Sequence, residues 1–288
     1  MQGMHRAWLV GLVSLTTIAV ACSTFDATSD PGTTDGGAEA GVDATADVSI
    51  TRDGDGAVDA AKDAPLVLDP YGLTVLADAP IAYWRFDEKS GSMAKDSTGN
   101  GHTLSCTAVV WNIPGAIPPG TAGDFEKAVN AQCELADSTF DFTGNKPFSV
   151  ELWARRDDAT NDDGFIGKTS PTSDPGSYTG WFFAVNTAAP EVTFRRLGMG
   201  AHFDGVLTAT VFHHLVGTFD GTTLQVYVDG MPGTQAGSAV SLAPEPMKML
   251  VGAVQNWGGM KGLIDEVAVY DKELPPDRVS AHFNARPR

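Results

Sequence analysis

Apolar and polar residues alternate over short stretches of this chain from about residue 65 onward, and clusters of Gly, Pro, Asn and Asp separate the stretches. The clearest example has Phe148, Val150, Leu152 and Ala154 at every second position. Successive side chains of a strand point to opposite faces, so this period predicts a strand with one apolar face. No long helical period appears before the last dozen residues, and the spacing of strands and turns predicts an all-β sandwich.

Two further patterns predict local features of this fold. Asp220 and Gly221 separate two strand-like stretches, which is a strong hairpin signal. Pro275 precedes an amphipathic stretch that carries Val279 and Phe283. Because Pro is well tolerated at the start of a helix, we expect one short C-terminal helix there.

The segment at 258–283 runs from a Gly-rich loop through Ile-Asp-Glu-Val-Ala-Val-Tyr to a Leu-Pro turn and the predicted helix. It resembles the closing segment of the laminin-G-like, concanavalin-A-like family. Further segments that resemble motifs of this family, in the family's order, are 81–91, 96–102, 148–153, 212–221 and 226–230. The resemblance implies a two-sheet antiparallel β-sandwich, a jelly roll, that binds a ligand.

The chain begins with the features of an exported lipoprotein. Arg6 precedes an uncharged run that is too short to span a membrane but typical of a signal peptide. Small residues then lead to Cys22, as in a bacterial lipobox, so 1–21 is predicted to be a lipoprotein signal peptide and Cys22 the lipidated residue. An ordinary cleavable signal is the alternative. Because Ser23 rather than Asp follows the cysteine, we expect an exported protein that is lipid-anchored to the cell envelope at the outer membrane.

Between this leader and the globular part lies a segment of different amino-acid composition. Residues 22–64 are dominated by Asp, Ala, Gly, Thr and Ser, and such a segment cannot bury enough apolar surface to offset its ordering entropy. We therefore predict an acidic, disordered linker at 22–64 and a laminin-G-like domain at 65–288. The chain carries 36 Asp and Glu against 19 Lys and Arg, a formal net charge of −17. This balance argues against a nucleic-acid partner, because phosphates are neutralised by clustered cations.

Cysteine usage agrees with export. With Cys22 assigned to lipid, Cys106 and Cys133 remain, and an even pair in an oxidising compartment predicts a disulfide. Two buried free thiols are the alternative.

Paired carboxylates of the kind used in glycoside hydrolysis are missing from the sequence. The glucanases whose architecture resembles this family use Glu-x-Asp-x-x-Glu on one strand, because a retaining mechanism needs two carboxyls about 5 Å apart, and this chain contains no Glu-x-Asp. Trp153 stands where Glu151 would need its partner, and Asp265 and Glu266 are neighbours that a regular strand points to opposite faces. His214 matches the family's structural His. We therefore expect no catalytic residues and no enzymatic activity.

Calcium is the predicted cofactor, in a structural role. The turn with Asp96 and Asn100 offers carboxylate, amide and carbonyl oxygens, which suit a cation that takes six to eight oxygen ligands. The family resemblance places the strand of Asp265 beside the N-terminal strand, and Glu88 is a further candidate ligand. The alternative is that Asp96 and Asn100 only shape a turn by capping backbone amides.

Four aromatic residues lie in or beside Gly- and Pro-rich stretches and are the candidate ligand contacts: Trp111, Tyr178, Trp181 and Trp257. Such rings combine a large apolar body with a polar tip, which suits stacking on a sugar at a wet surface. Packing at the edge of the domain is the alternative reading of each.

These features together predict a surface-tethered binding module whose partner is a carbohydrate or an extracellular protein. Its only membrane contact would be the lipid anchor. Two alternatives stay open: a glycoside hydrolase whose carboxylates come from different strands, and a purely structural or adhesion protein of the envelope.

Overall fold

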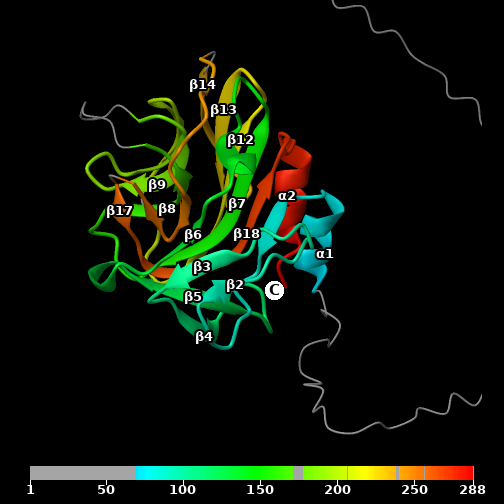
Figure 1. Ribbon diagram of the computed structural model, residues 1–288, viewed down its shortest axis with the longest axis vertical. Coiled ribbons are helices and arrows are strands. Elements are labelled where there is room, and N and C mark those ends of the chain that lie inside the picture. The colour runs from blue at the N-terminus through cyan, green and yellow to red at the C-terminus, as the bar shows by residue number, and fades with distance from the viewer. Residues whose placement is uncertain (1–68, 171–177, 206, 238–239, 256, 288) are drawn as a thin grey trace, which may run out of the picture. The chain divides into compact units, whose positions relative to one another are not determined.

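The computed structural model describes residues 69–287, except 171–177, 206, 238–239 and 256. The predicted signal peptide, Cys22, the whole predicted linker at 22–64 and its boundary with the domain lie outside the described residues. Within the described part, two antiparallel sheets face each other and two short helices cover one of them (Figure 1). The predicted β-sandwich is therefore confirmed. Neither of these helices has the length and apolar character needed to span a bilayer.

The first sheet has the strand order β14-β13-β12-β7-β18-β5-β4, and β1 also pairs with β18. Its strands are β1 (Ala82–Trp84), β4 (Val110–Pro114), β5 (Thr121–Glu126), β7 (Phe148–Arg156), β12 (Phe212–Phe219), β13 (Thr223–Val228), β14 (Met231–Gly237) and β18 (Lys261–Tyr270).

The second sheet has the order β11-β10-β9-β8-β15-β6-β3-β2. Its strands are β2 (Met93–Ala94), β3 (Leu104–Thr107), β6 (Gln132–Leu135), β8 (Asp163–Lys168), β9 (Trp181–Asn186), β10 (Glu191–Arg196), β11 (Met199–Asp204) and β15 (Met249–Val251). A small separate pair, β16 (Ala253–Val254) and β17 (Gly258–Gly259), lies beside β8, and two 3-10 turns span Lys127–Val129 and Ser138–Asp141.

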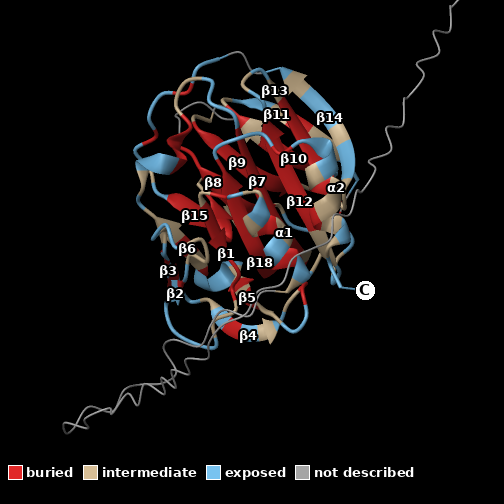
Figure 2. Ribbon diagram, turned by 90° about the vertical axis from the view of Figure 1, so that its right-hand side faces the viewer, coloured by how far each residue is buried: buried red, intermediate tan, exposed pale blue. Residues whose placement is uncertain are grey.

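The main core lies between the sheets and is built from alternate positions of their strands. On β7, the predicted residues Phe148, Val150, Leu152 and Ala154 are all buried in this core. The ring of Phe148 stacks on Phe142 with the ring centroids 4.4 Å apart. On the opposite face of β7, Glu151 and Trp153 are buried too, because helices cover the outer face of the first sheet (Figure 2), whereas Arg155 is only partly buried.

These helices are α1 (Pro70–Ala77) and α2 (Pro276–Asn284). The sequence pattern predicts only α2, so α1 is a correction. Asp69 Oδ1 accepts a hydrogen bond from a backbone N–H of the first turn of α1 at 2.8 Å, and Pro70 opens the helix. Both are start signals, but eight residues are too few to display a clear helical period. Tyr71 of α1 is fully buried against the sheet.

Two local predictions are confirmed. β12 and β13 form the expected hairpin, with Gly221 at φ 105° in the turn, a region that favours glycine. Cys106 of β3 and Cys133 of β6 are direct partners in the second sheet and form a disulfide.

One lateral edge of the sandwich is closed where β14 of the first sheet meets β11 of the second. Thr234 Oγ1 donates to the carbonyl oxygen of His202 at 3.0 Å and accepts from its N–H at 2.9 Å. A Cβ on Gly233 would lie 2.4 Å from the same carbonyl oxygen. Glycine at this position is therefore what lets the two edge strands approach.

Candidate ligand-binding surface and buried carboxylates

Two of the four predicted ligand contacts lie in the core instead of on a surface. Trp181 is completely buried between the sheets, and its Nε1 donates to the carbonyl oxygen of Phe140 at 2.8 Å. Trp111 is 9% exposed, stacks beside Phe86 and donates through Nε1 to the carbonyl oxygen of Gly91 at 2.8 Å. Both rings are enclosed by protein, so in this conformation neither offers a free face to a sugar.

Tyr178 and Trp257 lie together on the outer face of the second sheet, and both are partly buried. Phe182, the neighbour of Trp181 on β9, points outward and forms their floor. Its ring centroid is 5.0 Å from that of Tyr178 and 5.5 Å from that of Trp257. The indole of Trp257 is oriented by a hydrogen bond from Nε1 to the carbonyl oxygen of Val185 at 3.1 Å. We refer to Tyr178, Phe182 and Trp257 as the aromatic platform.

Polar side chains of β10 and β11 lie on the same face as the platform. Arg195 is the direct cross-strand partner of Phe182, and its guanidinium lies over the indole of Trp257, 5.9 Å from the ring centroid. Arg195 Nε donates to Thr193 Oγ1 at 3.1 Å. Glu191 lies 3.7 Å from the guanidinium of Arg195. The surface therefore combines two partly exposed aromatic side chains with hydrogen-bonding groups that hold one another in place.

His202 extends this polar row onto β11. It is the cross-strand partner of Thr193, and its Nδ1 lies 3.1 Å from Glu191 Oε2. We refer to Glu191, Thr193, Arg195 and His202 as the polar row.

The side chains of the predicted calcium ligands Asp96 and Asn100 bond to backbone groups of their own turn and of the neighbouring segment at β1. Asp96 Oδ1 accepts from the N–H groups of Tyr83 and Thr98 at 3.2 and 3.0 Å, and Oδ2 accepts from the N–H of His102 at 3.1 Å. Asn100 Nδ2 donates to the carbonyl oxygen of Ile81 at 3.0 Å. These contacts are those of residues that cap backbone amides and shape a turn.

Asp265 and Glu266 lie where the backbone of β18 departs from regular strand geometry. Glu266 has φ 52°, and the pairing of β18 with β7 shifts register at this point, which is the geometry of a β-bulge. Both carboxyls are buried, and burial together with the charge of the neighbouring Glu266 raises the pKa of Asp265 well above its ordinary value. The strand is therefore not regular at these two residues, contrary to the expectation from the sequence.

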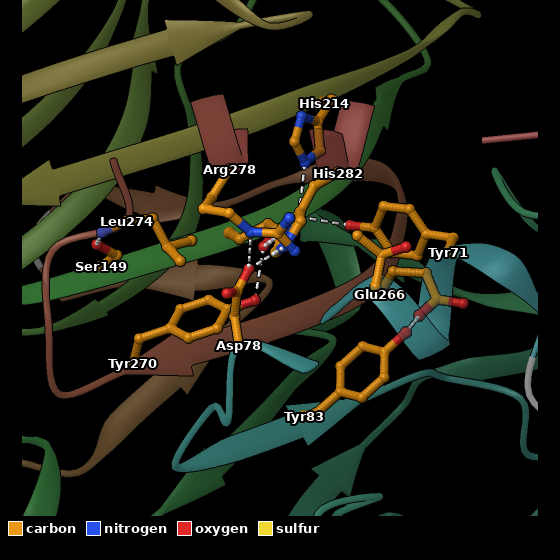
Figure 3. Close-up of polar contacts among 12 residues, drawn as sticks. Tyr71, Asp78, Tyr83, Ser149, His214, Glu266, Tyr270, Leu274, Arg278 and His282 are labelled. Atoms are coloured by element: carbon orange, nitrogen blue, oxygen red, sulfur yellow. Dashed lines mark hydrogen bonds and ion pairs between the residues drawn. The ribbon is translucent and has the colours of Figure 1, made fainter. Parts of the chain in front are cut away.

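Arg85 supplies the nearest positive charge to this pair. Its guanidinium lies 2.7 Å from Asp69, 3.0 Å from Asp87 and 3.5 Å from Glu266. Even with this partner, burial raises the pKa of Glu266 to about 8. Tyr83 donates a short hydrogen bond to Glu266 (Figure 3).

The four predicted calcium ligands do not converge on one point. Among the described residues, no group of three or more His, Cys, Asp or Glu side chains has the geometry of a metal site. Asp265 fits a cation best, because its Oδ1 is buried and has no partner among the described residues, whereas Oδ2 accepts from the N–H of Ala116 at 2.8 Å. Glu88 uses Oε1 to accept from the N–H of Lys95 at 2.8 Å and, within the same described part, leaves Oε2 without a partner.

A second carboxylate cluster, centred on Glu151, lies between the first sheet and the helices. Tyr71 of α1 and Tyr270 of β18 donate to its two oxygens at 2.7 and 2.8 Å. His214 Nε2 lies 2.8 Å from Oε1, and His282 Nδ1 of α2 lies 2.8 Å from Oε2. Figure 3 shows these side chains converging from the helices and the sheet.

All five members of this Glu151 cluster are completely buried. Burial alone raises the pKa of Glu151, but the charge of His282 and the hydrogen bonds from both histidines hold it well below its ordinary value. Sequence reasoning places His214 in a structural role and leaves Glu151 alone on its strand. Tyr71 and His282 were not identified from the sequence as partners of Glu151. The signal for them would have been a polar side chain on the apolar side of each short helix. The cluster joins α1 and α2 to the first sheet.

Comparison with known proteins gives the family of this chain. The sequence model described as the concanavalin A-like lectin/glucanases superfamily matches residues 127–280. No curated protein matched the chain.

Solved structures with a similar fold include the Trypanosoma rangeli sialidase in complex with the inhibitor DANA, which is 13% identical with a TM-score of 0.53 over 70% of this chain and 32% of the sialidase. The binding domain of Paraclostridial Mosquitocidal Protein 1 is 14% identical with a TM-score of 0.55 over 73% of this chain and 53% of that domain. The chain thus spans about a third of the sialidase structure, and these likenesses show a shared fold. Because the family match covers more than half of the chain, the protein belongs to the concanavalin A-like lectin/glucanase superfamily.

Proposed function

We propose that this protein is a carbohydrate-binding module and that the aromatic platform with the adjoining polar row is its binding surface. The observation that carries the proposal is the partly exposed indole of Trp257, held against Phe182 with Arg195 beside it. A sugar ring has an apolar face of C–H groups and an edge of hydroxyls. An aromatic surface next to fixed donors and acceptors matches both parts.

The polar row suits hydroxyl groups better than carboxylates. Arg195 is its one permanent cation, and Glu191 lies 3.7 Å from it, so most of its charge is already balanced. The side chains of Glu191 and Arg195 are 15% and 20% exposed, which leaves both able to exchange hydrogen bonds with a ligand. Charged hydrogen-bonding groups of this kind give stronger bonds to hydroxyls than neutral groups do.

The family and the structural neighbours support a glycan as the ligand class. The superfamily description names lectins and glucanases, and the sialidase of similar fold was solved with the inhibitor DANA. A hydrolase built on Glu151 has less support, because that carboxylate is fully buried and both of its oxygens are hydrogen-bonded. We further propose that the module is exported and held at the envelope by lipid on Cys22, which would place the surface near extracellular glycans.

The test is binding of the purified chain to soluble polysaccharides by affinity electrophoresis, with laminarin, arabinan, xylan and sialylated mucin as probes. Trp257→Ala should weaken binding at least tenfold, equivalent to about 1.4 kcal/mol. Arg195→Gln should weaken it without removing the platform. Leu73→Ala is the matched control, because Leu73 is 57% exposed on α1, away from the platform.

Thermal melting of each variant separates loss of binding from loss of folding. Wild-type protein that is not retarded by any glycan, or equal retardation of wild type and a folded Trp257→Ala variant, would reject this surface. Retention on envelope proteins alone would favour the adhesion alternative.

A further inference from the structure

A cavity of about 270 Å³ lies at one end of the sandwich, where β11 and β13 end and β12 and β14 begin. It is distinct from the aromatic platform. Its apolar wall is formed by Phe203, Leu207, Val228 and Met231. Leu207 and Val228 belong to the main core between the sheets, so the cavity is an opening in the end of that core.

The polar wall of the cavity is a His–Asp pair. His213 Nδ1 lies 2.7 Å from Asp229 Oδ2, and Asp229 Oδ1 accepts from the N–H of His214 at 2.9 Å. Burial alone raises the pKa of Asp229, but the hydrogen bonds from His213 and His214 bring it below its ordinary value. The carboxylate is therefore ionised at neutral pH and accepts the Nδ1 proton. When the imidazole carries one proton, that hydrogen bond selects the tautomer whose Nε2 has a lone pair.

This Nε2 atom lacks a hydrogen-bond partner. It is buried and makes no hydrogen bond with any described residue, although the side chain as a whole is 15% exposed. A buried acceptor that stays unpaired is unfavourable, and an unpaired ring nitrogen on a side chain that lines a cavity indicates a missing donor. Met231 is 63% exposed at the rim, and an unbranched thioether side chain adapts readily to a guest.

Charge and size limit what the donor can be. Asp204 and Asp229 are among the lining residues, and no Lys or Arg is found among the described residues that line the cavity. Anions are therefore disfavoured. A volume of about 270 Å³ is just below the range of pockets for drug-sized ligands, roughly 300–1,000 Å³, so the space suits a single ring.

We propose that this cavity is a second binding site, for a neutral ring that carries a hydroxyl group. The hydroxyl donates to His213 Nε2, and the apolar part of the ring contacts Phe203, Val228 and Met231. A single sugar unit and a simple cyclic alcohol share this chemistry. The proposal does not depend on the aromatic platform and remains if that surface binds nothing.

The test follows the imidazole nitrogens of the whole chain, labelled with ¹⁵N-histidine, by NMR at pH 8, where an unperturbed histidine is neutral. Cyclohexanol and methyl β-D-glucopyranoside are the two hydroxylated probes. Cyclohexanone has the same ring without a donor. We expect the ¹⁵N resonance of His213 Nε2 to shift in a saturable way with one of the hydroxylated probes. Cyclohexanone should bind at least tenfold more weakly. The probe that binds more tightly tells a sugar site from an alcohol site.

Variants confirm the location. His213→Phe should weaken binding of the hydroxylated probe at least tenfold, and Leu73→Ala, at an exposed position of α1 that does not line the cavity, should change it less than twofold. Met231→Trp fills the cavity from an exposed position and should block binding even if His213→Phe does not fold. The proposal is overturned if neither hydroxylated probe gives a saturable shift, if cyclohexanone binds equally well, or if binding survives Met231→Trp.

Discussion

His282 Nδ1 lies 2.8 Å from Glu151 Oε2, and its other ring nitrogen, Nε2, lies 2.7 Å from Asp78 Oδ2. Ionised carboxylates only accept hydrogen bonds, so both ring nitrogens must carry protons. Burial alone lowers the pKa of His282, but the charges and hydrogen bonds of Glu151 and Asp78 raise it above its ordinary value. One imidazolium on α2 therefore joins the cap of α1 to the centre of the first sheet.

The first prediction is that stability has a maximum in mildly acidic solution. The pKa of Glu151 is lowered from its ordinary value of 4.5, so its contribution is present above about pH 4.5 and is lost as pH falls through the lowered value. The pKa of His282 is raised from 6.5, so its contribution is complete below about pH 6.5 and is lost as pH rises through the raised value. Urea unfolding between pH 3 and pH 9 measures the profile.

His282→Gln is the matched variant for this profile. It should make the alkaline side less steep without flattening it, because Asp265 and Glu266, whose raised pKa values also make stability fall as pH rises, still titrate. The acid side should keep its slope, because Glu151 still titrates. An alkaline slope as steep as that of the wild type would mean that another group is responsible.

The second prediction concerns removal of the charge at the centre of the cluster. Glu151→Gln leaves the imidazolium of His282 without its buried partner, and breaking a buried ion pair on one side typically destabilises by about 3–5 kcal/mol. Tyr71→Phe removes a single hydrogen bond to the same carboxylate and should cost about 1–3 kcal/mol. Urea unfolding at pH 6 ranks the two. Equal losses would contradict a buried ion pair.

The two-sheet fold was predictable from the sequence. Apolar residues at every second position of β7 and the family motifs in their usual order are both features of local sequence. The position of Trp181 was not predictable, since a period of two tells which residues share a face but not which face meets the core. Here Trp181 points inward and Phe182 outward. The bulge at Glu266 was equally hidden, because a positive φ at a non-glycine residue arises from tertiary packing.

The Glu151 cluster shows a different limit. Its members come from α1, β7, β12, β18 and α2, and no spacing along the chain brings them together. A single polar residue within a buried strand indicates that a partner exists, but it does not say which one.

The third prediction is that Cys22→Ser prevents lipid attachment. One acyl chain gives only marginal membrane binding, and stable anchoring needs more than one, so the variant should lose the anchor completely. Detergent-phase partitioning after expression in a bacterium with two membranes measures this. The wild type should enter the detergent phase, and the variant should stay unprocessed or aqueous. Wild-type protein in the aqueous phase would support the ordinary cleavable signal.

The last prediction is that calcium stabilises the folded protein through Asp265. Its Oδ1 is buried without a partner among the described residues, and a Cβ on Gly115 would lie 2.4 Å from Oδ2, so the loop approaches this carboxyl closely. An ion that binds only the folded state adds about 2.7 kcal/mol at a hundredfold excess over Kd. We expect Tm to rise between chelator and millimolar calcium. Asp265→Ala should remove the rise, whereas Asp96→Asn should keep it, because the Asp96 carboxylate is already used by backbone N–H groups. A wild-type Tm that is the same in both solutions would exclude the ion.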